Sequence, residues 1–170
     1  SIIRLLDMGM DPFNFADALL GVLAQRLARR LCAKCKIPYE PAADELQALL
    51  REYCHELEHT STFKRDERAA YEGVFREWSA SFRNEKGGFT LYRKLGCEHC
   101  SNTGYKGRIG LHELLVGSDT VKRQVQERAR VAEILATALE EGMRTLKMDG
   151  IEKVLQGHTD MAQIRAVCIK

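Results

Sequence analysis

CAKC at residues 32–35 and CEHC at residues 97–100 are two Cys-x-x-Cys pairs in one chain, separated by residues 36–96. Two residues between cysteines let both sulfurs of a pair reach one ion, and two pairs supply the four thiolates of a structural zinc site. A redox dithiol would not need two pairs, and unliganded core cysteines rarely adopt this spacing. The sequence therefore predicts one zinc site with these ligands: Cys32, Cys35, Cys97 and Cys100.

Four cysteines fill the zinc shell and leave no position for water or substrate, so the predicted ion is structural rather than catalytic. Binding of this kind can supply on the order of 10 kcal/mol of folding free energy in small peptides. The stretch between the pairs is longer than in a common zinc ribbon. We therefore expect it to contain helices of its own, over residues 43–59 and 66–83, joined by a turn over residues 59–63.

Basic residues flank the first pair, and they can offset the negative formal charge of a zinc ion bound by four thiolates. They are Arg29, Arg30, Lys34 and Lys36. This explanation of the basic cluster does not require a nucleic-acid partner.

The other cysteines and histidines give weaker signals. Cys54 and Cys168 stand alone in helical patterns and are interpreted as packing residues. His55 and His59 lie one helical turn apart, a spacing that can bind a metal, but a solvated helix face is the preferred interpretation. His99 lies inside the second pair, where the geometry for a further ligand is poor, and it is interpreted as solvated.

Apolar spacing predicts helices at both ends of the chain. Large apolar side chains recur at every fourth position over residues 15–31, which predicts the strongest helix of the chain. A shorter amphipathic helix is expected over residues 1–10. Helices are also expected within residues 117–170, two of them closed by Gly142 and Gly157.

Short strands are expected over residues 89–92 and 108–116. The predicted fold class is thus mainly α with a small β element (α+β). We expect a helical bundle together with a tetracysteine zinc-binding module, into which a helical insert over residues 43–85 is placed.

Composition is that of a folded, water-soluble chain: 45% of the 170 residues are hydrophobic and 29% are charged. A net charge of +2 is too weak to predict a nucleic-acid partner. No apolar run approaches the roughly 20 residues of a membrane span, and the first residues lack the features of a signal peptide. The chain starts without Met inside a helical pattern, so we expect it to be a piece of a longer protein.

Four stretches resemble the type II secretion and type IV pilus assembly ATPases. They are LLDMGMDPF at residues 5–13, LGVLAQRLARRLC at 20–32, GCEHCSNTGYKGRIGLHELL at 96–115, and GMRTLKMDG at 142–150, followed by a Gly-x-Thr at 157–159. The resemblance covers essentially the whole chain except residues 43–85. It implies a hexameric cytoplasmic ATPase, peripheral to a bacterial inner membrane, that drives assembly of a pilus or pseudopilus.

In this family the zinc module is structural and lies at the edge of each subunit, where it can contact neighbouring subunits or proteins of the membrane platform. The resemblance divides the chain into residues 1–31, the C-terminal helices of the ATPase core; residues 32–116, the zinc module; and residues 117–170, a C-terminal helical subdomain. It leaves open whether the parent protein serves secretion, pilus assembly or DNA uptake.

The chain departs from the family in lacking Gly-x-x-x-x-Gly-Lys-Ser/Thr, the loop that cradles phosphates and places a hydroxyl on Mg²⁺. We therefore expect no ATP hydrolysis by these residues, and we assign ATP and Mg²⁺ to the longer parent alone. The insert over residues 43–85 is also longer than the linkers common in the family, and its role is open.

Two functions remain at this point. In the first, the chain is a non-catalytic part of such an ATPase, with Arg26, Arg29 and Arg30 as candidates for inter-subunit contacts or as solvated helix-end residues, and Arg108 as a candidate for approaching nucleotide. In the second, it is a free-standing zinc module that binds nucleic acid or an unfolded chain. Aromatic residues are only 7%, which disfavours nucleic acid, and a chaperone-type zinc domain would need more cysteine pairs.

Overall fold

The computed structural model describes residues 8, 9 and 11–168. This part of the chain contains helices and two small two-stranded sheets, so the predicted α+β class is confirmed. The elements in chain order are α2 (Pro12–Ala18), β1 (Gly21–Leu31), β2 (Ile37–Tyr39), α3 (Ala43–His55), α4 (Ser61–Arg65), α5 (Glu67–Phe82), β3 (Leu91–Arg93), the 3₁₀ turn η1 (Glu98–Cys100), β4 (Tyr105–Val116), α6 (Asp119–Gln126), α7 (Val131–Glu140), α8 (Leu146–Leu155) and α9 (Met161–Val167). The helix expected over residues 1–10 falls outside the described residues, except for a turn at residues 8 and 9.

The long helix expected over residues 15–31 is wrong. Helix α2 ends at Ala18, and β1 begins at Gly21 and pairs antiparallel with β4 along its length. A spacing of four fits both structures, because residues four apart share one face of a helix and also one face of a strand. The pairing with β4 decides between them. The strand expected over residues 108–116 is confirmed, and it begins earlier, at Tyr105.

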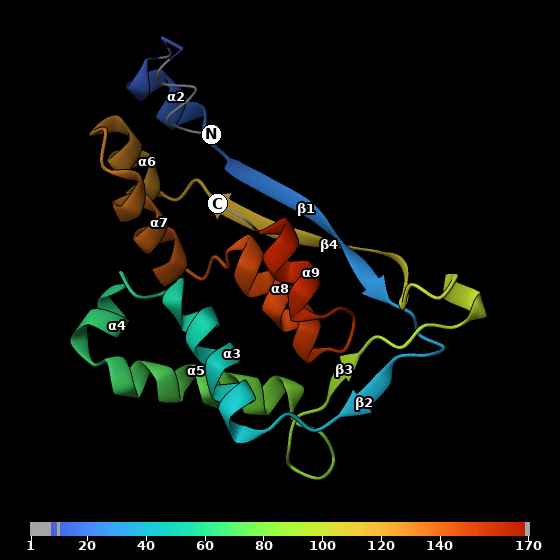
Figure 1. The fold of residues 1–170 in the computed structure, drawn as a ribbon. Helices are drawn as coiled ribbons and strands as arrows, with labels where there is room; N and C mark the ends of the chain where they lie inside the picture. The colour runs from blue at the N-terminus through green and yellow to red at the C-terminus, as the bar shows by residue number, and fades with distance from the viewer. Residues whose placement is uncertain (1–7, 10, 169–170) are drawn as a thin grey trace.

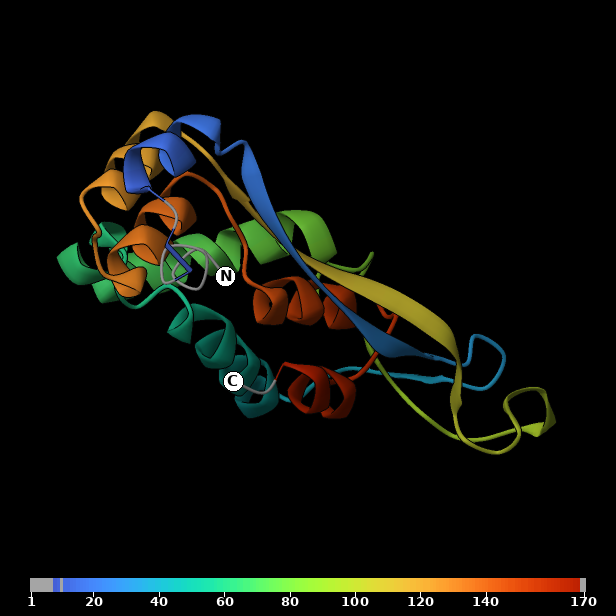
Figure 2. The same cartoon turned by 90° about the horizontal axis from the view of Figure 1, so that it is seen from above.

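The ribbon formed by β1 and β4 lies at the margin of the molecule, with helices on one side only (Figures 1 and 2). On that side, α8 contacts both strands and α9 contacts β1. Ala28 of β1 and Leu111 of β4 are buried there. The opposite face of the ribbon carries large exposed apolar side chains: Leu23 and Leu27 of β1, and Leu114 and Val116 of β4.

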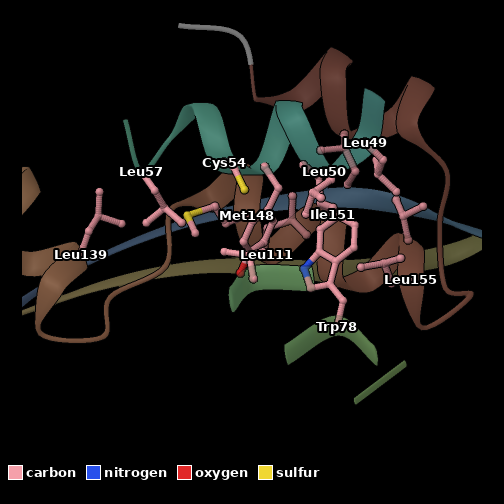
Figure 3. Packing of buried hydrophobic residues seen from close by; sticks show 14 of the residues in the cluster. Leu49, Leu50, Cys54, Leu57, Trp78, Leu111, Leu139, Met148, Ile151 and Leu155 are labelled. Atoms are coloured by element: carbon pink, nitrogen blue, oxygen red, sulfur yellow. The ribbon is translucent and has the colours of Figure 1, made fainter. Parts of the chain in front are cut away.

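Helices α3 and α5 of the insert pack against each other, and α3 also packs against α8. Their shared core, shown in Figure 3, includes Trp78, which meets Tyr53 edge to face with ring centroids 5.3 Å apart. The two helices expected over residues 43–59 and 66–83 are thus confirmed, although α3 ends at His55. The turn expected over residues 59–63 is replaced in part by α4.

The helices expected within residues 117–170 are present, and their ends follow the expected chemistry. The Ser118, Thr145 and Asp160 side chains accept backbone N–H groups at the starts of α6, α8 and α9. Gly142 and Gly157 adopt positive φ after α7 and α8. A single helical bundle is not confirmed. Helices α6 and α7 share a separate apolar cluster with α2, whereas α8 and α9 pack on the ribbon. The division into three domains stays a prediction.

Candidate metal centre

The connections at one end of the two sheets bring the cysteine pairs together. Cys32 follows β1 and Cys35 lies in the turn before β2, whereas Cys97 and Cys100 belong to the segment around η1, between β3 and β4. Because β1 pairs with β4 and β2 pairs with β3, both connections reach the same end of the molecule (Figure 1). Strand pairing between distant segments therefore creates the cluster.

The four Sγ atoms all lie within 4.8 Å of one another. Cys32 Sγ is 3.8 Å from Cys97 Sγ, and the Cys97 and Cys100 sulfurs are also 3.8 Å apart. Cys35 Sγ lies 3.9 Å from Cys100 Sγ. Four sulfurs bound at about 2.3 Å to one tetrahedral zinc ion would be roughly 3.8 Å apart. The cluster thus has the donor set and the size to hold one tetrahedral metal ion.

Backbone amides point at two of the sulfurs. The Gly96 N–H donates to Cys35 Sγ at 3.4 Å, and the N–H groups of Cys97 and Gly104 each donate to Cys100 Sγ at 3.2 Å. Such donors favour the thiolate, which is the form of cysteine that binds a metal. Sequence analysis missed these donors, although Gly96, directly before the second pair, was a signal for one of them.

Gly104 occupies a position that disfavours any residue with a side chain. Its φ is +82°, and a Cβ atom built there would lie only 2.6 Å from Lys94 Cβ. The same turn carries two non-glycine residues with positive φ, Ser101 and Asn102. This tight turn brings the Gly104 amide within reach of the Cys100 sulfur.

The surrounding groups shift the pKa of two of the thiols, Cys35 and Cys100. Burial raises the pKa of Cys100, but the Cys97 and Gly104 amides and the neighbouring thiols outweigh it and lower the pKa to about 6. The Gly96 amide lowers the pKa of Cys35, but burial and the other three thiols raise it to about 11. The amide donors thus favour the thiolate at Cys100, and metal binding by a cysteine releases its thiol proton.

The turn between α8 and α9 fastens the first cysteine pair to the rest of the fold. The Leu31 N–H donates to the His158 carbonyl at 2.9 Å, and Lys36 Nζ donates to the Gly157 carbonyl at 2.8 Å. The Lys36 ammonium also lies 4.2 Å from the centre of the Tyr92 ring. The Lys36 ammonium thus binds the C-terminal end of α8. From its place in the sequence we had expected it to offset the negative charge of the zinc–thiolate cluster. Backbone acceptors have no residue signature, so the sequence could not indicate these contacts.

The predicted interface arginines lie on the ribbon. Arg26, Arg29 and Arg30 belong to β1, so their interpretation as helix-end residues is wrong. Arg29 is the cross-strand partner of Arg108 in β4. Arg30 Nη2 lies 3.5 Å from His158 Nδ1. Contact of these arginines with another subunit stays a prediction.

The remaining candidate residues lie away from the cluster. Cys54 is buried in the core, where desolvation raises its pKa to about 12, as expected for a packing residue. Cys168 is partly buried against the same core. His55 and His59 each lie 3.3 Å from a carboxylate oxygen of Glu58, and they are well exposed. No other group of described residues places three metal-binding side chains within the same short distance.

No helix in the described part of the chain combines the length and the apolar composition that a membrane span requires.

Comparison with known proteins gives a consistent result along the chain. The sequence model of the family described as type II/IV secretion system protein matches residues 1–166. The type IV pilus assembly ATPase PilB of Thermus thermophilus is 35% identical over 100% of this chain and 16% of its own length.

Type II secretion relatives are equally similar. The type II secretion system protein E of Dickeya dadantii is 35% identical over 95% of this chain and 25% of its own length. The type II secretion system ATPase E of Vibrio cholerae is 33% identical over 98% of this chain and 27% of its own length. The chain thus spans about a quarter or less of these relatives. With the family model matching almost from end to end, the chain belongs to the type II/IV secretion system protein family.

Proposed function

We propose that the chain is the C-terminal, non-catalytic part of a longer ATPase that powers type II secretion or type IV pilus assembly. The observation that carries this proposal is the extent of the match. The family model runs along the whole chain, while the chain spans no more than 27% of the relatives named above, two of which are named as ATPases.

ATP and Mg²⁺ belong to the rest of that longer protein. The chain has no Gly-x-x-x-x-Gly-Lys-Ser/Thr sequence, and without that loop no backbone cradle or Mg²⁺-binding hydroxyl of this type is available. The contribution of these residues is then structural: they shape and connect subunits.

Zinc is the ion that the cysteine cluster fits best. Four thiolates in a tetrahedral arrangement are typical of zinc or iron, and a structural zinc site is the commoner use of two Cys-x-x-Cys pairs. The ion would join the ends of both sheets and so hold the insert, residues 43–85, beside the ribbon. With all four positions taken by sulfur, it has no catalytic role.

The assembled protein is proposed to be a homohexamer in the cytoplasm, peripheral to the inner membrane. The zinc module would contact neighbouring subunits or membrane-platform proteins. Arg26, Arg29, Arg30 and Arg108 are candidates for such contacts, because all four are exposed and belong to the ribbon at the margin of the molecule.

ATP turnover tests the non-catalytic assignment. The purified 170-residue chain should release no phosphate from Mg·ATP above the buffer rate, whereas the longer protein that contains it should. Steady hydrolysis by the short chain, lost on mutation of one of its own residues, would refute the assignment.

Elemental analysis tests the metal. We expect one zinc per chain, lost in Cys97→Ser and retained in Cys168→Ser, which removes a lone thiol away from the cluster. Full zinc content in the Cys97 variant would contradict the four-ligand site.

A further inference from the structure

A groove of about 970 Å³ runs between α3 and α5 on the surface of the insert, and we name it the α3–α5 groove. It is open rather than enclosed. A small ligand is usually held in a pocket that encloses most of its surface, so an open groove suits a polypeptide. The residues that line it all fall within residues 43–85, outside the four stretches that resemble the family.

The floor of the α3–α5 groove is apolar and aromatic. Leu50 of α3 lines it together with Tyr71 and Phe75 of α5. The Tyr71 ring packs edge to face on Phe63 with ring centroids 5.6 Å apart, and the Phe75 ring centroid lies 5.8 Å from that of Phe89. These contacts hold both rings in place and leave part of each exposed. Fixed, partly exposed aromatic rings are typical anchor points of protein interfaces.

The walls of the α3–α5 groove carry unmatched positive charge. Arg51 lies on the α3 wall, and Arg68 and Arg76 lie on the α5 wall. The acidic neighbours are already engaged: Arg68 Nε lies 3.4 Å from Glu72 Oε1, and Glu67 in the first turn of α5 suits the positive end of that helix. Among the described residues, Arg51 and Arg76 form no ion pair with a carboxylate. Both walls would therefore attract a partner with acidic side chains.

The dimensions of the α3–α5 groove fit a helix. Its lining residues on α5 run from Glu67 to Arg76, which is about 15 Å at the rise of an α-helix. A docked helix of similar length presents apolar anchors at positions i, i+3 or i+4, and i+7 along one side. An added strand would need a free sheet edge, whereas both walls of this groove are helices.

We propose that the α3–α5 groove binds an amphipathic helix of a separate protein. The apolar side of that helix would cover Leu50, Tyr71 and Phe75, and carboxylates at its margins would reach Arg51 and Arg76. This inference goes beyond the proposed function, which leaves the insert without a partner of its own. Helices α2 and α5 lie on opposite sides of the molecule (Figure 1), so a segment that precedes α2 would have to pass around the molecule to reach the groove.

A second copy of the chain offers no suitable helix within the described residues. Large exposed apolar side chains lie on its helices only at Phe13 of α2 and at Val131 and Leu135 of α7. Helix α2 has 7 residues, about two turns, and is shorter than the groove. Helix α7 turns by about 100° per residue, which puts Glu133 and Glu140 on the opposite side from its two exposed apolar residues. The acidic and apolar side chains of α7 therefore cannot enter one groove together.

Two synthetic helical peptides test the groove with the purified 170-residue chain in the presence of zinc. Both carry leucines at positions i, i+4 and i+7; beside this stripe one peptide has glutamates and the other has lysines. In fluorescence anisotropy at low salt, the acidic peptide should bind at least about tenfold more tightly than the basic one, because like charges across an interface oppose binding. Equal affinity for the two peptides would overturn the proposal.

Charge-reversal variants assign this preference to the groove. The double variant Arg51→Glu/Arg76→Glu should prefer the basic peptide, because it reverses the charge of both walls. Arg83→Glu is the matched control, since Arg83 is an exposed arginine directly after α5 and outside the groove; it should keep the preference of the parent. All three arginines are exposed, so the variants should melt as the parent does. A preference for the acidic peptide that persists in the double variant would overturn the proposal.

Amide chemical shifts locate the bound peptide. The acidic peptide should shift the NMR resonances of residues 47–51 and 67–76, and shifts confined to the β1–β4 ribbon would overturn the proposal. The longer protein should bind the acidic peptide as well as the 170-residue chain does. Binding by the short chain alone would assign the groove to a segment of the longer protein itself and would overturn the assignment to a separate partner.

Discussion

Leu111→Ala and Leu114→Ala make the same chemical change in one strand, on opposite faces of the ribbon. Leu111 is fully buried in the core beneath β4, whereas Leu114 is 53% exposed on the side of the ribbon that the helices leave uncovered. Loss of a buried leucine costs its transfer free energy together with a cavity term, about 2–5 kcal/mol. Loss of a half-exposed leucine costs about 1 kcal/mol or less, because it leaves no closed cavity.

Urea unfolding followed by circular dichroism measures both free energies in the 170-residue chain with metal present. A cost of about 3 kcal/mol for Leu111→Ala corresponds to a fall in Tm of roughly 6–12 °C for a chain of this size. The Leu114 variant should stay within about 4 °C of the parent. Equal costs for the two variants would refute the orientation of the ribbon, and with it the distinction between its faces.

Three further predictions concern single residues. Burial, aided by the charge of a nearby aspartate, raises the pKa of Glu152; the folded state therefore favours its protonated form, and stability is lost as the pH rises through the raised value. Glu152→Gln should need more urea to unfold than the parent at about pH 7 and the same amount at about pH 4, and no gain at neutral pH would contradict this. Gly150→Ala should lower the free energy of unfolding by about 1–3 kcal/mol despite the better helix propensity of alanine, because the new Cβ would lie 2.8 Å from Ile164 Cδ1. In Gly73→Ala of α5 the nearest atom to the new Cβ is 3.8 Å away, so urea unfolding should show a gain in that free energy of up to about 1 kcal/mol. Gly104→Ala should lose metal in elemental analysis while the helices persist by circular dichroism, and full metal content would show that the turn tolerates a side chain.

Local sequence was sufficient for most helices and for one of the long strands. The N-cap residues and the closing glycines of the C-terminal half define helix ends through contacts within a few residues, and such contacts leave a signature in the sequence. The strand ending at Val116 was also expected, from the pattern of its own residues. The family, too, followed from motifs that can be read along the chain.

The segment over residues 21–31 shows what local pattern could not decide. Its leucines satisfy helix and strand periods equally, so the choice lay with β4, a partner that follows much later in the chain. The same pairing turned three arginines from helix-end residues into members of a sheet. It also produced the exposed apolar face, which no residue pattern within either strand reveals.

Sequence by itself determined which sulfurs could share an ion, since Cys-x-x-Cys spacing restricts each pair to a single turn. Tertiary structure decided that the two pairs meet, with sulfurs 3.8 Å apart across residues 32 and 97, and which amides and helix ends support them. The physical reason is the distance along the chain over which each interaction acts. A turn is fixed by torsions of neighbouring residues, whereas the meeting of distant turns depends on long-range strand pairing and on the burial of α8 beneath the ribbon.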